Sequence, residues 1–181
     1  QQQHEEIVAQ RDYIANQNGE LSEKNKHITD SIRYAQTIQE AILPFKERLD
    51  TAFNKDYFVI FKPKDIVSGD FYWFEQMGNK KFLAVVDCTG HGVPGAFMSM
   101  VGFSVLNDEV IKSRVHDPAQ ILDRMHNTIT RILKQDEAEG NQDGMDVAFC
   151  TVEDKPNNMV EICFCGAKRP LYFFAPYSDE L

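Results

Sequence analysis

Residues 82–94 read FLAVVDCTGHGVP and carry the clearest structural signal in this 181-residue chain. An apolar run of strand length ends in Asp87, and a turn built on Gly90 and Gly92 leads to Pro94 at the start of a helix. A carboxylate placed there projects into a cleft, and the glycines let backbone groups approach a ligand closely. Hard cations such as Mg²⁺ and Mn²⁺ take such oxygen ligands. The alternative interpretation is that Asp87 only caps the following helix.

Two further acids stand at the margins of hydrophobic strands. Asp70 precedes the aromatic run FYWF at 71–74, and Asp146 precedes the apolar run VAFC at 147–150. Carboxylates beside apolar strands are costly to desolvate unless they share a positive charge. The three acids together therefore predict a cation site.

The region after residue 57 alternates short apolar runs with turn signals, which is typical of strands. Gly78-Asn79 reads as a tight turn, and Asp117-Pro118 reads as a helix start. Strands followed by a helix pair and then more strands predict an α+β domain with helices packed on antiparallel sheet. The predicted strands are 57–62, 69–77, 81–87, 145–152, 160–165 and 171–175, and the predicted helices are 95–111 and 117–134.

Residues 5–43 have a different hydrophobic period from the rest of the chain. Apolar side chains recur there every seventh residue, at Ile7, Ile14, Leu21, Ile28, Ala35 and Ile42. This period predicts a helix in a left-handed, parallel coiled-coil dimer. The second half of the seam is weak, with Arg11, Asn18, Asn25, Ile32 and Gln39. The alternative is a solvated linker helix that is disordered alone. Pro44 ends the helix, so the predicted division is a linker at 1–44 and a domain at 45–181.

The net charge of the chain argues against two classes of binding partner. A formal net charge of −9 repels both nucleic acid and an anionic membrane surface, so we expect neither as a partner. An acidic enzyme acting on phosphate esters needs bound cations to hold its substrate.

The four cysteines form no CxxC pair and are interpreted as buried reduced thiols. No run approaches the roughly 18 apolar residues of a membrane span. We expect a cytoplasmic protein.

Four motifs occur in an order that resembles the bacterial PPM phosphatases, and in particular their SpoIIE/RsbU-like branch. They are VSGDFY at 67–72, VDCTGHGVPGA at 86–96, GMD at 144–146 and GAKRPL at 166–171. The linker helix that precedes the domain in this branch is similar to residues 28–44, and the resemblance extends to about Phe174.

The resemblance implies a fold of two antiparallel sheets flanked by helices, with two Mn²⁺ or Mg²⁺ ions between the sheets. Asp87 would bridge both ions, the backbone carbonyl of Cys88 would bind one, Asp146 the other, and Asp70 would bind directly or through water. The implied reaction is in-line attack of metal-activated water on phosphoserine or phosphothreonine. The implied substrate is a regulatory phosphoprotein such as an anti-sigma-factor antagonist, and the implied control acts through the N-terminal helix.

Some features depart from this family pattern or stay open. The pattern continues with a further strand that carries another aspartate, whereas this sequence ends at Leu181, so we expect the 181-residue chain to be nearly inactive. His91 is either a general acid or, as favoured here, part of the turn, bonded to nearby backbone. Lys168 and Arg169 either contact the phosphoprotein or are solvated. The competing functions are a catalytically silent dimerising relay, a nuclease and a small-molecule phosphatase.

Overall fold

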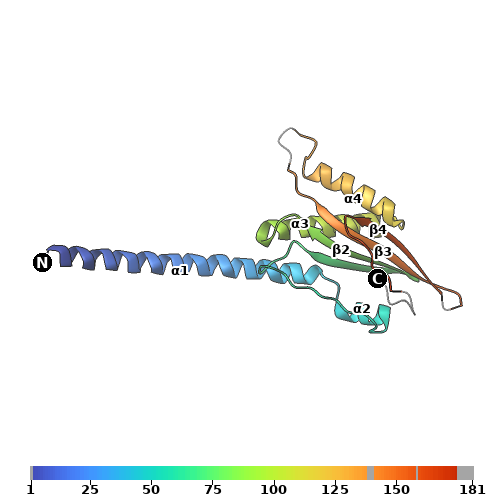
Figure 1. Cartoon of the computed structure of the whole chain (residues 1–181), viewed down its shortest axis with the longest axis horizontal. Helices are drawn as coiled ribbons and strands as arrows, with labels where there is room; N and C mark the ends of the chain where they lie inside the picture. Colours follow the sequence, from blue (N-terminus) through green and yellow to red (C-terminus); the bar gives the residue numbers. More distant parts are fainter. Residues whose placement is uncertain (1, 138–140, 158, 175–181) are drawn as a thin grey trace.

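The computed structural model describes residues 2–137, 141–157 and 159–174. A long helix leads into a domain in which helices lie against one sheet (Figure 1). The elements in chain order are α1 (Gln2–Ile42), α2 (Lys46–Phe53), β1 (Phe71–Met77), β2 (Lys80–Cys88), α3 (Gly92–Leu106), a π-helical extension (Asn107–Lys112), α4 (Pro118–Ile132), β3 (Met145–Lys155) and β4 (Met159–Ala167).

The four strands form one antiparallel sheet in the order β1-β2-β3-β4. The tight turn at Gly78-Asn79 pairs Met77 with Lys80 and confirms the predicted hairpin. Further along, Phe71 lies opposite Val86, and Val86 lies opposite Val147. The strands predicted around 69–77, 81–87, 145–152 and 160–165 are therefore confirmed, as is the α+β class.

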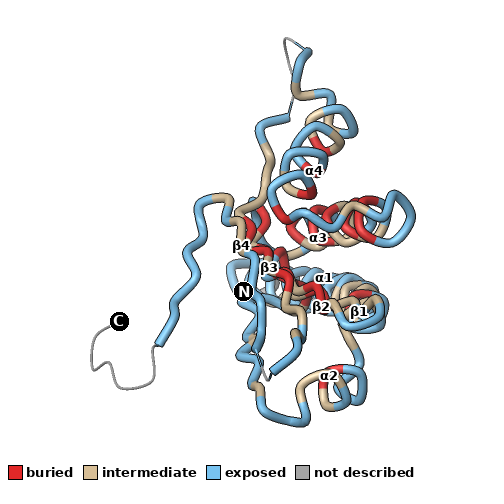
Figure 2. The backbone as a smooth tube through the Cα atoms, turned by 90° about the vertical axis from the view of Figure 1, so that its right-hand side faces the viewer, coloured by how far each residue is buried: buried red, intermediate tan, exposed pale blue. Residues whose placement is uncertain are grey.

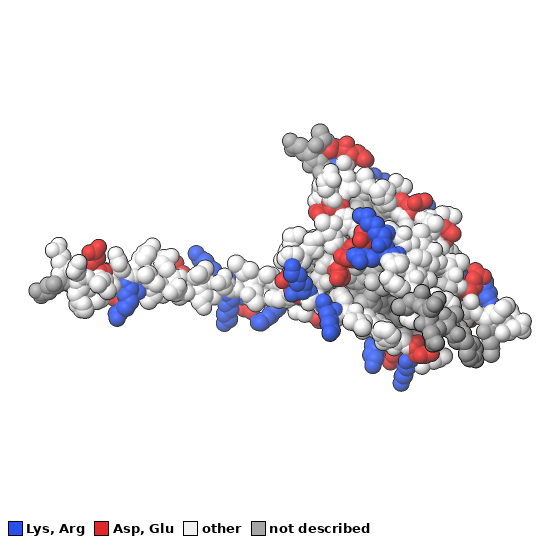
Figure 3. All heavy atoms as spheres, in the orientation of Figure 1, with Lys and Arg blue, Asp and Glu red and all other residues white. Residues whose placement is uncertain are grey.

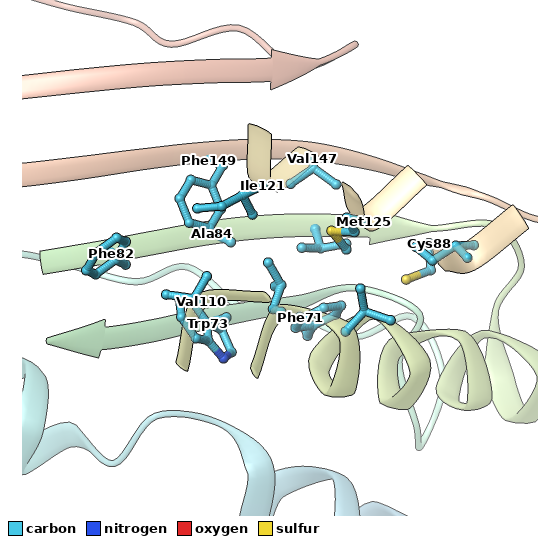
Figure 4. Close-up of a cluster of buried hydrophobic side chains, with 14 of the residues drawn as sticks. Phe71, Trp73, Phe82, Ala84, Cys88, Val110, Ile121, Met125, Val147 and Phe149 are labelled. Atoms are coloured by element: carbon cyan, nitrogen blue, oxygen red, sulfur yellow. The ribbon is translucent and has the colours of Figure 1, made fainter. Parts of the chain in front are cut away.

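The hydrophobic core lies between the sheet and the helices α3 and α4, where Figure 2 shows buried backbone on facing elements. Side chains alternate along the strands, so every second residue points to these helices. Phe71, Phe82 and Phe149 are at most 1% exposed and belong to one apolar cluster with Ile121 and Met125 of α4 (Figure 4). Asp117 caps α4 by accepting a hydrogen bond from the Gln120 backbone N–H at 2.8 Å, as its sequence predicts.

The opposite face of the sheet is covered only in part. Phe53 of α2 packs on Phe74 of β1 with 5.7 Å between ring centroids. Farther across the sheet, Val85 of β2 is 63% exposed and Ile162 of β4 is 52% exposed. We call this the open face. The second sheet implied by the resemblance is not among the described residues, whose strands all belong to the sheet above.

The helix α1 confirms the predicted extent of the linker helix and ends at Ile42, two residues before Pro44. Its seam residues Ile7, Ile14, Leu21 and Ile28 are all more than half exposed. Gln39, which the seven-residue pattern assigned to the weak half of the seam, is instead buried in the domain. The correction has a physical reason, because the Gln39 amide satisfies backbone groups of the domain that would otherwise lack partners.

Two predicted strands are wrong. Residues 57–62 form no strand: Phe58 is 84% exposed, Tyr57 donates a hydrogen bond to Asp50 at 2.9 Å, and Pro63, just beyond, has no N–H for a ladder. Residues 171–174 form no strand either, and Ala175 lies outside the described residues.

Other expectations are adjusted in detail. The helix predicted at 95–111 begins earlier, at Gly92, and its last turn widens into the π-helical extension. The cysteines are all free thiols, as expected, but Cys88 is buried while Cys163 is exposed, so burial was predicted wrongly for Cys163. Within the described ranges, no helix combines the length and the apolar character that a bilayer span requires.

Candidate functional site

The three acids singled out in the sequence form one row across the sheet. Asp87 of β2 lies directly opposite Asp146 of β3. Asp70 immediately precedes Phe71, whose partner is Val86, so Asp70 stands beside Asp87 on the other side. Residues next to these acids point into the core, and strand alternation therefore turns the acids to the open face. The structure thus brings together residues that are far apart in the sequence.

Glycines hold the loops around this row at close range. A Cβ atom on Gly69 would lie 2.7 Å from the carbonyl oxygen of Gly90, and one on Gly95 would lie 2.6 Å from the same oxygen. Gly90 and Gly92 have positive φ angles of 88° and 63°, which residues with a side chain rarely adopt. These glycines allow the Asp70 loop, the turn after β2 and the start of α3 to pack backbone to backbone.

The turn after β2 is also bonded to the start of β3. The Thr89 N–H donates to the Gly144 carbonyl oxygen at 2.9 Å, and the Gly144 N–H donates to Thr89 Oγ1 at 3.0 Å. This reciprocal pair fixes the relative positions of the strand segments that carry Asp87 and Asp146.

The acids perturb each other electrostatically. Burial raises the pKa of Asp70, and a hydrogen bond with Asp87 and the negative charge of Asp87 raise it further, while Arg169 opposes the rise. Burial, followed by the charges of Asp70 and Asp87, raises the pKa of Cys88 to about 12. The Cys88 thiol is therefore protonated and lies in the core, which leaves only its backbone carbonyl for the ligand role that the resemblance implies.

Two basic side chains reach the row of acids from the segment after β4. Arg169 forms an ion pair with Asp87 and lies 3.3 Å from Asp146, measured from Nη2 to Oδ2. The Nζ atom of Lys168 lies 3.6 Å from Asp146 Oδ1. The sequence left these residues open between substrate contact and solvation; the structure pairs both with the candidate ligands.

His91 has a different partner from the one expected. Its Nδ1 lies 2.7 Å from Oδ2 of Asp65, and both side chains are exposed. The expected bond to nearby backbone is replaced by this carboxylate–imidazole pair. Nothing in the sequence pattern singled out Asp65, which lies 26 residues away.

Gln39 also supports the site in a way that the sequence did not reveal. Its side chain connects α1 to the loop before Asp70. Its Nε2 donates to the Ser68 carbonyl oxygen at 2.6 Å and to Ser99 Oγ at 2.8 Å, and its Oε1 accepts from the Ser68 N–H at 2.8 Å. Ser68 Oγ in turn accepts from the Asp70 N–H at 3.0 Å. The sequence carried no signal that set Gln39 apart, because the other members of its heptad position are also polar except Ile32.

The donor set fits hard divalent cations, because it consists of carboxylate oxygens, and two of the acids, Asp87 and Asp146, already share one positive side chain. Across the described part of the chain, however, no group of three or more His, Cys, Asp and Glu side chains is gathered tightly enough to hold a metal ion. The ligand roles of Asp70, Asp87, Cys88 and Asp146 stay predictions.

Comparisons with known proteins agree with this arrangement. The family model described as Stage II sporulation protein E (SpoIIE) matches residues 78–176, which is more than half of the chain. Among solved structures, the chain is similar to the SiaA-PP2C domain of Pseudomonas aeruginosa, with a TM-score of 0.61 and 35% sequence identity. That match covers 70% of this chain and 49% of the other, so this sequence spans about half of the matched chain. No curated protein matches. The expected resemblance is confirmed: the chain belongs to the SpoIIE family of PPM-type phosphatases.

Proposed function

We propose that this protein hydrolyses phosphoserine or phosphothreonine in a regulatory phosphoprotein, with Mn²⁺ or Mg²⁺ held by Asp70, Asp87 and Asp146. The observation that carries the proposal is the row of these carboxylates on the open face. Family membership alone supports only a phosphatase, and the row supports the proposal that these particular side chains carry the reaction.

Each residue has a distinct task in this proposal. Asp87, in the middle of the row, has an acidic neighbour on either side, so we assign to it the bridging role. The Cys88 carbonyl would bind one cation, and Asp146 would bind the other. Asp70 would bind directly or through water. Two divalent cations, when bound, supply a nucleophile at neutral pH and neutralise the charge on the phosphoryl oxygens.

The shape of the surface favours a protein substrate over a small molecule. Asp70 is exposed, and Asp87 and Asp146 retain 47% and 29% of their side-chain exposure. A cavity of about 250 Å³ lies elsewhere, between the end of α1, β1 and α3, and the acids do not line it. Small-molecule sites are normally enclosed, so an exposed row of acids suits a phosphorylated segment of another protein. On the face in Figure 3, acidic and basic side chains are interspersed, without the broad basic surface that a nuclease needs.

The proposed control acts through α1 in a parallel homodimer. The exposed seam residues Ile7, Ile14, Leu21 and Ile28 would pair with those of a second copy. The bonds from Gln39 to Ser68 and Ser99 link the same helix to the Asp70 loop and to α3. A change in α1 would therefore reach a candidate ligand through Ser68.

Phosphatase assays test the reaction. Because the family pattern carries a further aspartate after the last matched motif, we compare residues 1–181 with a C-terminally extended version. We expect the extended version to release phosphate from a phosphoserine protein in the presence of Mn²⁺, to be inhibited by EDTA, and to favour this protein over an aryl phosphate. The 181-residue chain should be nearly inactive. Equal rates for the two versions would contradict the need for the further aspartate.

Sedimentation tests the dimer and the competing relay function. We expect residues 1–181 to dimerise at high micromolar concentration and residues 45–181 to be monomeric. A monomer of residues 1–181 would contradict the parallel dimer. A dimer whose C-terminally extended version binds Mn²⁺ but turns over no phosphoprotein would instead favour the catalytically silent relay.

A further inference from the structure

Arg169 lies within the GAKRPL motif, which left its role open between contact with the phosphoprotein and solvation. Its guanidinium contacts Asp87 and Asp146, the central and outer acids of the row, while Lys168 reaches only Asp146. Among the ion pairs of the described residues, those of these two acids come from Lys168 and Arg169 alone. Arg169 is therefore the basic side chain that bridges the two acids.

The backbone under Arg169 is constrained, whereas its guanidinium is not. Lys168 has a positive φ of 61° and forms an isolated bridge with Val147, the neighbour of Asp146. A Cβ atom on Gly166 would lie only 2.1 Å from the Arg169 carbonyl oxygen, so the chain turns back tightly here. The Arg169 side chain is still 46% exposed. Rotation of the side chain can therefore move the guanidinium while the backbone stays beside the acids.

We propose that Arg169 is a phosphate-binding residue that exchanges partners: it pairs with Asp87 and Asp146 in the metal-free protein and turns to the substrate's phosphoryl oxygens in the metal-loaded protein. This inference rests on the proposed function. A guanidinium and a divalent cation repel each other at contact distance, so they compete for the same carboxylate oxygens. A guanidinium also matches phosphate oxygens with two parallel hydrogen bonds.

The exchange gives Arg169 two effects of opposite sign. As a competitor for the carboxylates, it weakens the binding of Mn²⁺ to the metal-free protein. As a partner for the phosphoryl group, it strengthens the binding of substrate and of inorganic phosphate once the cations are present. A residue with only a structural role would not improve one kind of binding and impair the other when it is replaced.

The first test measures Mn²⁺ binding, without any turnover. Isothermal titration compares wild-type residues 1–181 with Arg169→Gln, with Lys168→Gln as the matched neighbour, whose 84% exposed side chain contacts one acid only. We expect Arg169→Gln to bind Mn²⁺ several-fold more tightly and Lys168→Gln to change the affinity less. An unchanged or weaker affinity in Arg169→Gln overturns the inference.

The second test measures phosphate binding in the C-terminally extended version loaded with Mn²⁺. We expect Arg169→Gln to raise KM and the inhibition constant of inorganic phosphate by roughly tenfold or more, the scale of one charged hydrogen bond, with a smaller change in kcat. Arg169→Lys should recover part of this loss. Unchanged KM and phosphate inhibition overturn the inference but leave the proposed function intact. Absence of Mn²⁺ binding to the wild-type extended version contradicts the proposed function itself.

Discussion

The two faces of the sheet use the same strands for different purposes. On the face covered by α3 and α4, Phe82 and Phe149 are completely buried and belong to one apolar cluster. On the open face, Val85 is 63% exposed, and acids stand at the ends of the strands. Consecutive residues such as Val86 and Asp87 thus face the apolar core and the proposed metal site respectively. Substitution of the acids on the open face should therefore lower activity, and substitution of core residues on the covered face should lower stability.

The largest expected effect is on activity, from the open face. Asp87→Asn in the C-terminally extended version should remove Mn²⁺-dependent turnover down to background, because the carboxylate is the proposed bridge between cations. Its free energy of unfolding should change by less than about 1 kcal/mol, since the ion pair it loses is exposed. Phosphate release and urea unfolding measure the two quantities. Asp70→Asn should be less severe, and substantial turnover in Asp87→Asn would contradict the bridging role.

The next largest effect is on stability, from the covered face. Phe149→Ala should lower the free energy of unfolding by about 3–5 kcal/mol, because a fully buried ring is replaced by a cavity. The single tryptophan, Trp73, stacks on Phe149 with 6.4 Å between ring centroids, so its fluorescence reports on the unfolding of this core. A urea transition that matches that of the wild type would mean that the covered face is not the source of stability.

A smaller effect is expected where α1 meets the domain. Gln39→Ala leaves the Ser68 N–H and C=O without their side-chain partner and should cost about 1–3 kcal/mol. Gln17→Ala, on the exposed part of the same helix, provides the control and should cost much less. Urea unfolding followed by Trp73 fluorescence measures both, and equal costs would show that the Gln39 contacts contribute nothing.

The smallest effect sharpens the comparison within one strand. Val85→Ser on the open face should change the free energy of unfolding by less than about 0.5 kcal/mol, as exposed sites usually do. Its neighbour Ala84 is 2% exposed, and Ala84→Ser should cost about 1–3 kcal/mol by burying a hydroxyl group. Thermal unfolding of the pair measures this difference. The reverse order would mean that the open face is covered in solution.

Local patterns predicted much of this fold. The period of two in the central strands, the turn at Gly78-Asn79 and the cap at Asp117 each depend on residues near one another in sequence, and each is confirmed. The same reasoning failed for residues 57–62, because alternation alone does not supply a neighbouring strand. It also placed Gln39 in a coiled-coil seam, because a seven-residue pattern does not record which end of a helix docks on a domain.

For the candidate site, the acidic residues could be predicted from the sequence, but their partners could not. Asp70, Asp87 and Asp146 could be selected as acids beside apolar strands, and the register now places them in one row. The ion pair of Arg169 with Asp87 and the pairing of His91 with Asp65 join residues 82 and 26 positions apart. Such contacts depend on how loops cross the sheet, and neither periodicity nor spacing encodes that path.

The position of β4 at one end of the strand order has a consequence for colloidal behaviour. Among the described residues β4 is an outer strand whose backbone groups are available for another chain, and it also presents the exposed side chains of Met159, Val160 and Ile162. Mutual repulsion from the net charge of −9 opposes such self-association at low ionic strength. Salt shortens the range of that repulsion to about 3 Å at 1 M. The protein should therefore stay dispersed in dilute buffer and associate edge to edge as ionic strength rises.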